Sequence, residues 1–346
     1  MQTIKHQAWP DIGQFRNMIR AVKEKATFSH LDVNGDAVFD PSKPLPILQF
    51  HGTVKLHGTN AAIGVTKDGD IWYQSRSRVI TLEDDNAGFV RFWKDLEDKG
   101  FTFKNLLSSV IHEGSEILVA GEWCGGNIQK GVALNQLEKM FVIFGVKVDG
   151  EWLSPEEVSQ FPMATDHNIF NVYSIETYKI EIDFNKPEIA QDKLVKLVEM
   201  IEKTCPWGKK FGVEGIGEGA VFRPIDKEWE STKLWFKVKG SDHQISHVKT
   251  LAPVDIEKVI SERAFVEMVV TEARCVQMIQ KVKESGVKVV DRTHLAQALR
   301  WIYNDIVKEE SDVAIGNGID ISKMGGMISN YTKQWFFKNE DKFDEL

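Results

Sequence analysis

The stretch Lys55-Leu-His-Gly-Thr-Asn60 decides the fold of this chain, because it lies between two apolar runs. The run Pro46-Ile-Leu-Gln-Phe50 precedes it, and the run Ala61-Ala-Ile-Gly-Val65 follows it directly. Both runs have the length and composition of short β-strands. The sequence therefore predicts that Lys55 stands at a strand-to-loop junction on a buried sheet. Gly58 would then form a tight turn, where the missing Cβ lets a phosphate approach the backbone.

Lys55, with a glycine three positions later and polar groups beyond it, suits attack on a nucleotide α-phosphate. An ordinary lysine has a pKa of about 10.4 and is no nucleophile at neutral pH. A catalytic lysine must therefore be desolvated or placed beside other cations, and we expect a lowered pKa for Lys55. The alternative is an exposed lysine in a hairpin, which a K-x-x-G pattern alone favours.

Two apolar segments near residue 220 and residue 235 are predicted to be strands of the sheet that carries Lys55. Lys237 and Lys239 are two positions apart, so their side chains point to one face while Val238 points to the other. Two ammonium groups on one face suit an anion such as a triphosphate, with Glu218 nearby to hold Mg²⁺. The alternative is the solvated face of an antiparallel hairpin.

Glu122 ends the strand-like run that starts at Glu116, whose apolar composition draws the carboxylate towards the interior. Such a carboxylate requires a hydroxyl or cationic partner. Phe144 ends another apolar run, which starts at Met140. From the residues alone, Phe144 is an ordinary core phenylalanine.

Further motifs follow Lys55 along the chain: Ser75-Arg-Ser-Arg78, Gly121-Glu-Trp-Cys-Gly125, Phe141-Val-Ile-Phe-Gly145, Glu218-Gly-Ala-Val-Phe-Arg-Pro224 and Leu234-Trp-Phe-Lys-Val-Lys239. In this order they resemble the signature motifs of the covalent nucleotidyltransferases, which include ATP-dependent ligases and mRNA capping enzymes. The extended K-x-H-G-T-N motif and the run Gly125-Gly-Asn-Ile-Gln-Lys-Gly131 are most similar to the RNA ligase 2 family. The resemblance covers roughly residues 45 to 240.

The resemblance implies an ATP-dependent RNA ligase. Lys55 would attack the α-phosphate of ATP and retain AMP, which would pass to a 5′-phosphate before a 3′-hydroxyl closes the nick. It implies catalytic roles for Lys55, Lys237 and Lys239, and a Mg²⁺ (or Mn²⁺) ion on Glu218. It implies nucleotide contacts by Val54, Leu56, His57, Asn60, Arg76, Glu122, Phe144, Glu218, Lys237 and Lys239. Arg76 is preferred over Arg78 as the arginine of the site. The resemblance also implies that Glu122 binds the ribose and that the purine stacks on Phe144.

Two positions depart from the family pattern. The residue before the lysine is often glutamate and is Val54 here, and the residue after the stacking aromatic is commonly aspartate and is Gly145 here. The nucleotide pocket is therefore expected to differ in detail. A DNA ligase, a capping-type nucleotidyltransferase and a non-catalytic nucleic-acid-binding relative stay open as alternatives.

The resemblance implies nucleic acid as the partner, either nicked duplex RNA or RNA with a 3′-hydroxyl RNA strand. A chain of net charge −8 must gather its positive charge on one surface to bind such a polyanion, or bind it weakly and briefly. The candidate runs are Lys209, Lys210, Lys233, Lys237, Lys239 and Lys249, and near the N-terminus Arg16, Arg20, Lys23 and Lys25. No stretch is apolar enough to span a membrane and no signal-peptide pattern is present, so we expect a cytoplasmic protein, and a monomer. Three widely spaced cysteines and the His243/His247 pair indicate neither a disulfide framework nor a zinc site.

The pattern of apolar residues along the chain changes near Gly240. Residues 1–240 alternate strand-like runs with helices predicted over 85–97 and 187–201, which indicates an α+β nucleotidyltransferase (adenylation) domain with mainly antiparallel sheets. Residues 241–346 show helical periodicity over 254–285, 293–309 and 319–337, with breaks predicted at Gly286, at Gly316-Asn-Gly318 and at Gly325-Gly326. We expect a small all-helical C-terminal domain. DNA ligases and capping enzymes of the superfamily typically carry an OB-fold barrel there, so helices favour the RNA ligase 2 type.

Overall fold

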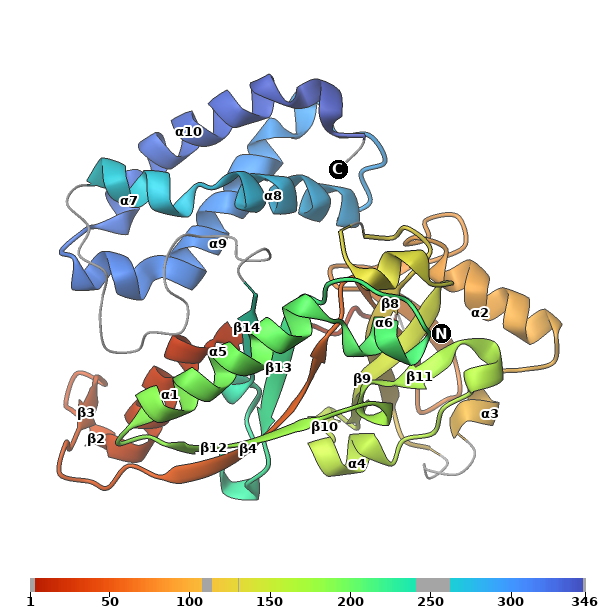
Figure 1. Ribbon diagram of the computed structural model, residues 1–346, viewed down its shortest axis with the longest axis horizontal. Coiled ribbons are helices and arrows are strands. Elements are labelled where there is room, and N and C mark those ends of the chain that lie inside the picture. Colours follow the sequence, from red (N-terminus) through yellow and green to blue (C-terminus); the bar gives the residue numbers. More distant parts are fainter. Residues whose placement is uncertain (1–3, 108–113, 130, 241–261, 345–346) are drawn as a thin grey trace. The chain divides into compact units, whose positions relative to one another are not determined.

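A computed structural model describes residues 4–107, 114–129, 131–240 and 262–344 (Figure 1). The chain divides into two compact units, Met1–Gly240 and Ser241–Leu346. The first contains mainly antiparallel sheets with helices, and the described part of the second is helical. This confirms the predicted fold class.

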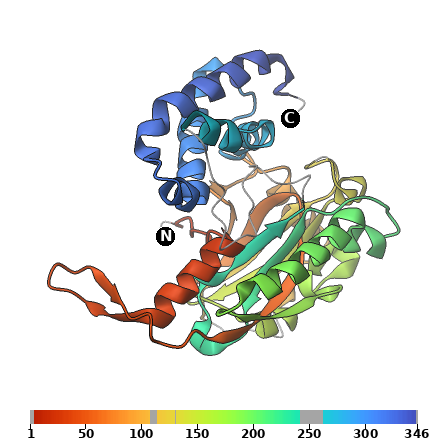
Figure 2. The ribbon, with the colours of Figure 1, turned by 60° about the vertical axis from the view of Figure 1, so that its left-hand side comes forward.

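A five-stranded sheet carries Lys55 at the end of one of its central strands. Its order is β1 (Gly13–Gln14), β14 (Phe236–Lys239), β13 (Gly219–Pro224), β4 (Ile47–Lys55) and β12 (Tyr178–Asp183), and every pair is antiparallel except β1 with β14. Helices α1 (Phe15–Thr27) and α5 (Pro187–Lys203) lie against this sheet (Figure 2). Phe50, Phe222 and Phe236 pack together on the face that they share with Val54. The opposite face is left for polar side chains.

The second, seven-stranded sheet has the order β10 (Glu151–Trp152), β9 (Met140–Val148), β8 (Ile117–Cys124), β5 (Thr59–Val65), β6 (Ile71–Ser75) and β7 (Val79–Ile80), with β11 (Ile169–Asn171) parallel to β9. One face packs against α2 (Phe89–Asp98) and α3 (Phe103–Leu107), around buried Trp93, Trp123 and Phe141. This unit also contains the hairpin of β2 (Phe28–Leu31) and β3 (Ala37–Phe39) and the short helices α4 (Pro155–Ser159) and α6 (Pro206–Lys210).

The loop 56–58 joins the two sheets, because β4 belongs to one and β5 to the other. The predicted strand-to-loop junction at Lys55 is thus confirmed. The structure shows a steric reason for glycine at position 58, which differs from the phosphate approach expected from the sequence. A Cβ on Gly58 would lie 2.4 Å from the carbonyl oxygen of Trp123, so the loop needs glycine to pass the end of β8.

The helix predicted from Asp85 begins later, at Phe89. The Asp85 carboxylate instead accepts hydrogen bonds from the backbone N–H groups of Val90 and Arg91, at 2.9 and 3.0 Å. Asp85 therefore satisfies the first turn of α2 from outside it, as acidic residues before a helix commonly do.

The helical unit contains α7 (Glu262–Val269), α8 (Glu272–Glu284), α9 (Leu295–Gly316) and α10 (Gly325–Lys338). The predicted helix 254–285 is wrong as a single element, since a break at Val270–Thr271 separates α7 from α8 and 254–261 lie outside the described residues. Gly325 begins α10 instead of breaking a helix. The helices share a core that includes Phe265, Met278, Ile302, Ile306 and Phe336. Among the described helices, none is long and apolar enough to cross a membrane.

Candidate functional site

Lys55 and Lys239 face each other across β13. In the sheet register, Gly219 is paired with Lys55 on one side and with Lys239 on the other, so both lysines project from the same face. Gly219 has φ +145°, and a Cβ there would lie 2.1 Å from the carbonyl oxygen of Val238. Only glycine fits this position, and its conformation sets the direction of the preceding residue, Glu218.

Glu218 lies at the centre of a group of three basic side chains. Its Oε2 accepts a hydrogen bond from Lys55 Nζ at 2.7 Å and lies 3.2 Å from His57 Nδ1. Its Oε1 forms an ion pair with Lys239 Nζ at 2.9 Å. The Glu218 side chain is 3% exposed, whereas those of Lys55 and His57 are about one quarter exposed. We call Lys55, His57, Glu218 and Lys239 the lysine cluster.

The charges of the lysine cluster shift its pKa values in different directions. Burial lowers the pKa of Lys55, but the carboxylates of Glu218 and Glu122 outweigh burial and hold it above the ordinary lysine value. Burial also lowers the pKa of Lys239, and there it prevails. Burial would raise the pKa of Glu218, but Lys239 and Lys55 bring it well below the usual range. The expected lowered pKa of Lys55 is therefore wrong for this arrangement, in which Lys55 is a protonated partner of Glu218.

A second polar group lies on the face of the seven-stranded sheet. Asn60 Nδ2 donates to Glu122 Oε2 at 2.7 Å, and Arg76 Nη1 donates to Asn60 Oδ1 at 3.2 Å. Arg76 Nη2 also forms an ion pair with Asp11 at 2.6 Å. Glu122 is buried as predicted, and the hydrogen bond described for its carboxylate comes from the carboxamide of Asn60. Arg78 is directed elsewhere and forms an ion pair with Asp84.

The two polar groups influence each other electrostatically, since Glu122 and Arg76 both contribute to the pKa of Lys55. The structure thus brings together Lys55, His57, Asn60, Arg76, Glu122, Glu218 and Lys239. Lys237 projects from the same face as Lys239, as strand alternation requires.

Val54 and Leu56 contribute differently from the charged residues. Val54 is 2% exposed and lies on the opposite face of β4 from Lys55, in the apolar core. The Leu56 side chain is also buried, while its carbonyl oxygen lies 3.5 Å from Lys55 Nζ. A contact of either residue with a nucleotide would therefore involve the backbone.

Phe144 is half-buried where the pairing of β8 with β9 shifts register. It packs, with Trp9 and Trp152, against the small apolar cluster formed by Ala62, Trp72, Leu118 and Ala120. A Cβ on Gly145 would lie 2.9 Å from Trp152. The ring of Trp152 therefore occupies the space that the side chain of the family's common aspartate would need at position 145.

Oxygen ligands suitable for a hard divalent cation lie in both polar groups, namely the carboxylates of Glu218 and Glu122 and the carboxamide of Asn60. Within the described ranges, no group of three or more His, Cys, Asp or Glu side chains has the arrangement of a metal site. This donor set fits Mg²⁺, which commonly takes one or two carboxylates and completes its shell with water and substrate phosphates. Cys124, Cys205 and Cys275 are free and buried, and His243 and His247 lie outside the described residues.

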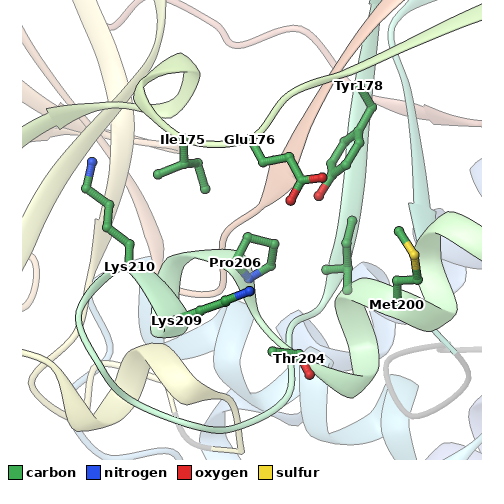
Figure 3. Close-up of a pocket in the computed structure, with 9 residues that line it drawn as sticks. Ile175, Glu176, Tyr178, Met200, Thr204, Pro206, Lys209 and Lys210 are labelled. Atoms are coloured by element: carbon green, nitrogen blue, oxygen red, sulfur yellow. The ribbon is translucent and has the colours of Figure 1, made fainter.

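The expected basic surfaces are found in part. Arg16 is buried, so the N-terminal run is shorter than predicted, and Lys249 lies outside the described residues. Lys209 and Lys210 are exposed and border a cavity of about 520 Å³ (Figure 3). Tyr178 lines this cavity together with residues of α5 and α6. Along β12 the side chains of Tyr178 and Ile180 point to the face of the five-stranded sheet that the helices cover, and Lys179 points to the other face. The lysine cluster lies on that other face, so the cavity is separate from it.

Sequence reasoning missed three residues of the site: Trp9, Asp11 and Trp152. Each reaches the site by a contact distant in sequence, and no local periodicity marks such a contact. The only available signals were the charge of Asp11 and the size of the two tryptophans.

Comparison with known proteins identifies a family. The family model described as RNA ligase matches residues 48–239, which is more than half of the chain. No curated protein sequence gives a significant match.

Solved structures of an RNA ligase from Naegleria gruberi are also similar. The structure with PPi has 16% identity and a TM-score of 0.43, over 68% of this chain and 56% of that one. A variant with ATP and Mn has 17% identity and a TM-score of 0.43, over 68% and 57%. A variant with AMP and Mn has 17% identity and a TM-score of 0.42, over 68% and 56%. The chain thus spans less than two thirds of the length of each of these proteins.

Proposed function

Because the chain belongs to the RNA ligase family, we propose that it is an ATP-dependent RNA ligase that acts through a covalent lysyl-AMP intermediate. In this proposal Lys55 attacks the α-phosphate of ATP and releases pyrophosphate. The AMP is transferred to the 5′-phosphate of a strand, and the 3′-hydroxyl at a nick then displaces AMP and closes the phosphodiester. The biological role that follows is RNA repair.

The observation that carries the proposal is the row Lys55–Gly219–Lys239 with Glu218 between the two ammonium groups. One carboxylate holds two lysines of the sheet and the histidine of the loop 56–58, so the group has an excess of positive charge. An incoming triphosphate would be attracted by Lys237, Lys239 and Arg76, and these cations would stabilise the charge that develops on the phosphate oxygens.

Lys55 must lose its proton before it can attack, and Glu218 is the group that holds this proton most strongly. Any change that reduces the negative charge on Glu218 lowers the pKa of Lys55, because burial and Arg76 already favour the neutral amine. A Mg²⁺ or Mn²⁺ ion held by Glu218 would supply this charge compensation and would neutralise phosphate charge. Lys239, with its lowered pKa, would remain beside the phosphates.

The acceptor in this proposal is a nicked duplex with RNA on the 3′-hydroxyl side. The exposed Lys209, Lys210 and Lys233 supply positive charge on a chain of net charge −8, so binding would be local and dependent on salt. We assign residues 1–240 as the adenylation domain and residues 241–346 as a helical domain that engages the duplex. The enzyme would work as a monomer in the cytoplasm.

The decisive experiment is incubation with α-labelled ATP and Mg²⁺, followed by denaturing electrophoresis. We expect an acid-labile labelled adduct on the wild-type chain and none on Lys55→Ala. Lys67→Ala, which removes an exposed lysine paired with Asp149, is the matched control and should label normally. The absence of an adduct on the wild type would contradict the proposal and favour a non-catalytic relative.

The acceptor requires a second experiment, with the adenylated protein offered nicked RNA, nicked DNA and hybrid duplexes. We expect sealing to depend on a ribonucleotide at the 3′-hydroxyl end. Equal sealing of all-DNA nicks would indicate a DNA ligase, and an adduct formed with GTP in preference to ATP would indicate a capping-type enzyme.

A further inference from the structure

Residues 6–11 run along the end of β6 and are fixed there by side-chain hydrogen bonds. The backbone N–H of Gln7 donates to Gln74 Oε1 at 3.1 Å, and Gln74 Nε2 donates back to the carbonyl oxygen of Gln7 at 2.8 Å. Gln7 Nε2 donates to Glu116 at 2.8 Å. This reciprocal pairing places the segment on the face of the seven-stranded sheet that also presents Asn60 and Glu122.

Trp9 brings this segment to the aromatic side of the site. Its ring centroid lies 5.9 Å from that of Phe144 with the planes inclined by 54°, a geometry typical of favourable aromatic pairs. Its Nε1 donates to the carbonyl oxygen of Ser75 at 3.2 Å, so the indole is held by its polar edge and cannot turn freely. Trp9 therefore supports the orientation of Phe144.

Asp11 brings the same segment to the charged side of the site. Its carboxylate binds Arg76 Nη2 at 2.6 Å, while Arg76 Nη1 binds Asn60 and Asn60 binds Glu122. A guanidinium held by two acceptors has a defined plane, and its remaining N–H groups have a defined direction. The chain of contacts from Asp11 to Glu122 thus orients the arginine proposed to bind phosphate.

We propose that residues 6–11 are a wall of the nucleotide site, in which Trp9 positions Phe144 for the base and Asp11 positions Arg76 for the phosphates of ATP. Both are positioning residues, since each acts through the residue it touches. The inference rests on the proposed function and adds to it an N-terminal segment that lies outside the matched range 48–239.

The exposure of Asp11 separates this role from a purely structural one. The Asp11 side chain is 59% exposed, and an ion pair this exposed contributes little to folding stability. Asp84 is a matched control, because it is also 59% exposed and is paired with Arg78, two residues from Arg76. Removal of the Asp11 carboxylate or of the Asp84 carboxylate should change folding stability equally little. Only removal of the Asp11 carboxylate should change the orientation of Arg76.

The test measures the single-turnover rate of adduct formation for the full chain and its Asp11→Ala, Arg76→Ala, double and Asp84→Ala variants. We expect Asp11→Ala to slow adduct formation about 10-fold, which is less than the roughly 10²-fold loss that misplacement of a group can cause, because Arg76 keeps its contact with Asn60. In the Arg76→Ala background the same change should have almost no further effect, because Asp11 acts through Arg76. Asp84→Ala should match the wild type, and Asp11→Asn should recover part of the rate.

Trp9 is tested by equilibrium binding of ATP to the Lys55→Ala chain, which cannot react. We expect Trp9→Ala to weaken binding about 3- to 10-fold, as loss of one aromatic pair would, and Trp9→Phe to restore most of the affinity. Trp229→Ala is the control, since this half-buried tryptophan packs under Lys25. Thermal unfolding of every variant identifies any that fail to fold.

The outcomes separate the two proposals. A wild type that forms no Lys55 adduct overturns the proposed function and this inference with it. A wild type that forms the adduct, with folded Asp11→Ala and Trp9→Ala variants that behave like their controls, overturns this inference alone. Additive effects of Asp11→Ala and Arg76→Ala would equally contradict the positioning role of Asp11.

Discussion

Two of the buried ionic clusters in the described part of the chain differ in their charge balance. In the lysine cluster, Glu218 is surrounded by Lys55, His57 and Lys239, and the lysines remain partly exposed. In the helical unit, Arg274 is fully buried between Glu310, at 2.9 Å, and Asp305, at 2.9 Å, and its Nη1 donates to the carbonyl oxygen of Val269.

The difference shows how a binding site can be distinguished from a structural ion pair. The Arg274–Glu310 pair is closed, because neither side chain has exposed surface. Asp305 adds a second carboxylate that is 16% exposed, so this cluster has no excess of positive charge. The lysine cluster has an excess of basic groups and an open side, so an anion can still improve its charge balance. Removal of a partner should therefore affect stability in the helical unit and chemistry in the sheet unit.

The largest effect is expected at Lys55. Lys55→Arg keeps a cation beside Glu218 but removes the amine that can become a nucleophile, since a guanidinium stays protonated. Adduct formation should fall by at least about 10³-fold, while the melting temperature should change little. Labelling with α-labelled ATP and thermal unfolding check the two halves of this prediction. A labelled Lys55→Arg adduct would place the nucleophile elsewhere.

The next effect is on stability and concerns Arg274. Arg274→Met leaves Glu310 buried without its partner, which should destabilise the chain by about 3–5 kcal/mol. Arg274→Met combined with Glu310→Leu should recover part of this loss, because the fully buried carboxylate of Glu310 is removed and only the partly exposed Asp305 loses its contact with Arg274. Arg292→Met, which breaks an exposed pair with Glu340, should cost less than about 1 kcal/mol. Urea unfolding measures all three, and equal losses for Arg274→Met and Arg292→Met would remove the distinction between the clusters.

Glu218→Gln tests the charge balance of the lysine cluster directly. The carboxylate raises the pKa of Lys55, so its removal should lower that pKa and populate the neutral amine at lower pH. The pH dependence of acylation of Lys55, followed by peptide mass spectrometry without ATP, should shift to lower pH. Lys67 serves as an internal reference on the same chain. A shift to higher pH would mean that the Glu218 carboxylate does not raise the pKa of Lys55 as described.

The smallest effect concerns the glycines of the two units. Gly145→Asp restores the residue common in the family but places its Cβ against Trp152, which should cost about 1–3 kcal/mol. Gly326→Ala, in α10 with open space around it, should instead stabilise the chain by about 0.5–1 kcal/mol. Thermal unfolding of both variants checks the signs. A neutral Gly145→Asp would show that Trp152 moves away without cost.

The sequence was sufficient for the parts of the site that lie on strands. The apolar runs around Lys55, Glu122 and Glu218 predicted β4, β8 and β13, and the two-residue spacing predicted that Lys237 and Lys239 share a face. The sequence was insufficient to predict features that depend on contacts between segments distant along the chain. The raised pKa of Lys55 depends on Glu218, and the caps of α2 and α10 depend on local geometry that periodicity does not encode.

Arg16 shows the same limit from the other side. Its position in a basic run suggested a surface, but Arg16 is buried on α1 while Arg20, one helical turn further on, is exposed. A run of basic residues in a helix therefore indicates a nucleic-acid-binding surface only when it is known which of these residues lie on the exposed face of the helix. The roles of the individual site residues stay predictions that the variants above will test.

The sequence separation between Lys55 and Glu218 has a consequence for the synthesis of the protein. These residues are 163 positions apart, and Lys239 completes their cluster from the last strand of the sheet unit. Contacts of such long range form late, after the intervening chain has been made. A nascent chain that has not yet released β14 from the ribosome therefore lacks the assembled cluster, and the proposed reaction with nucleotide would begin only after residue 239 has left the ribosome.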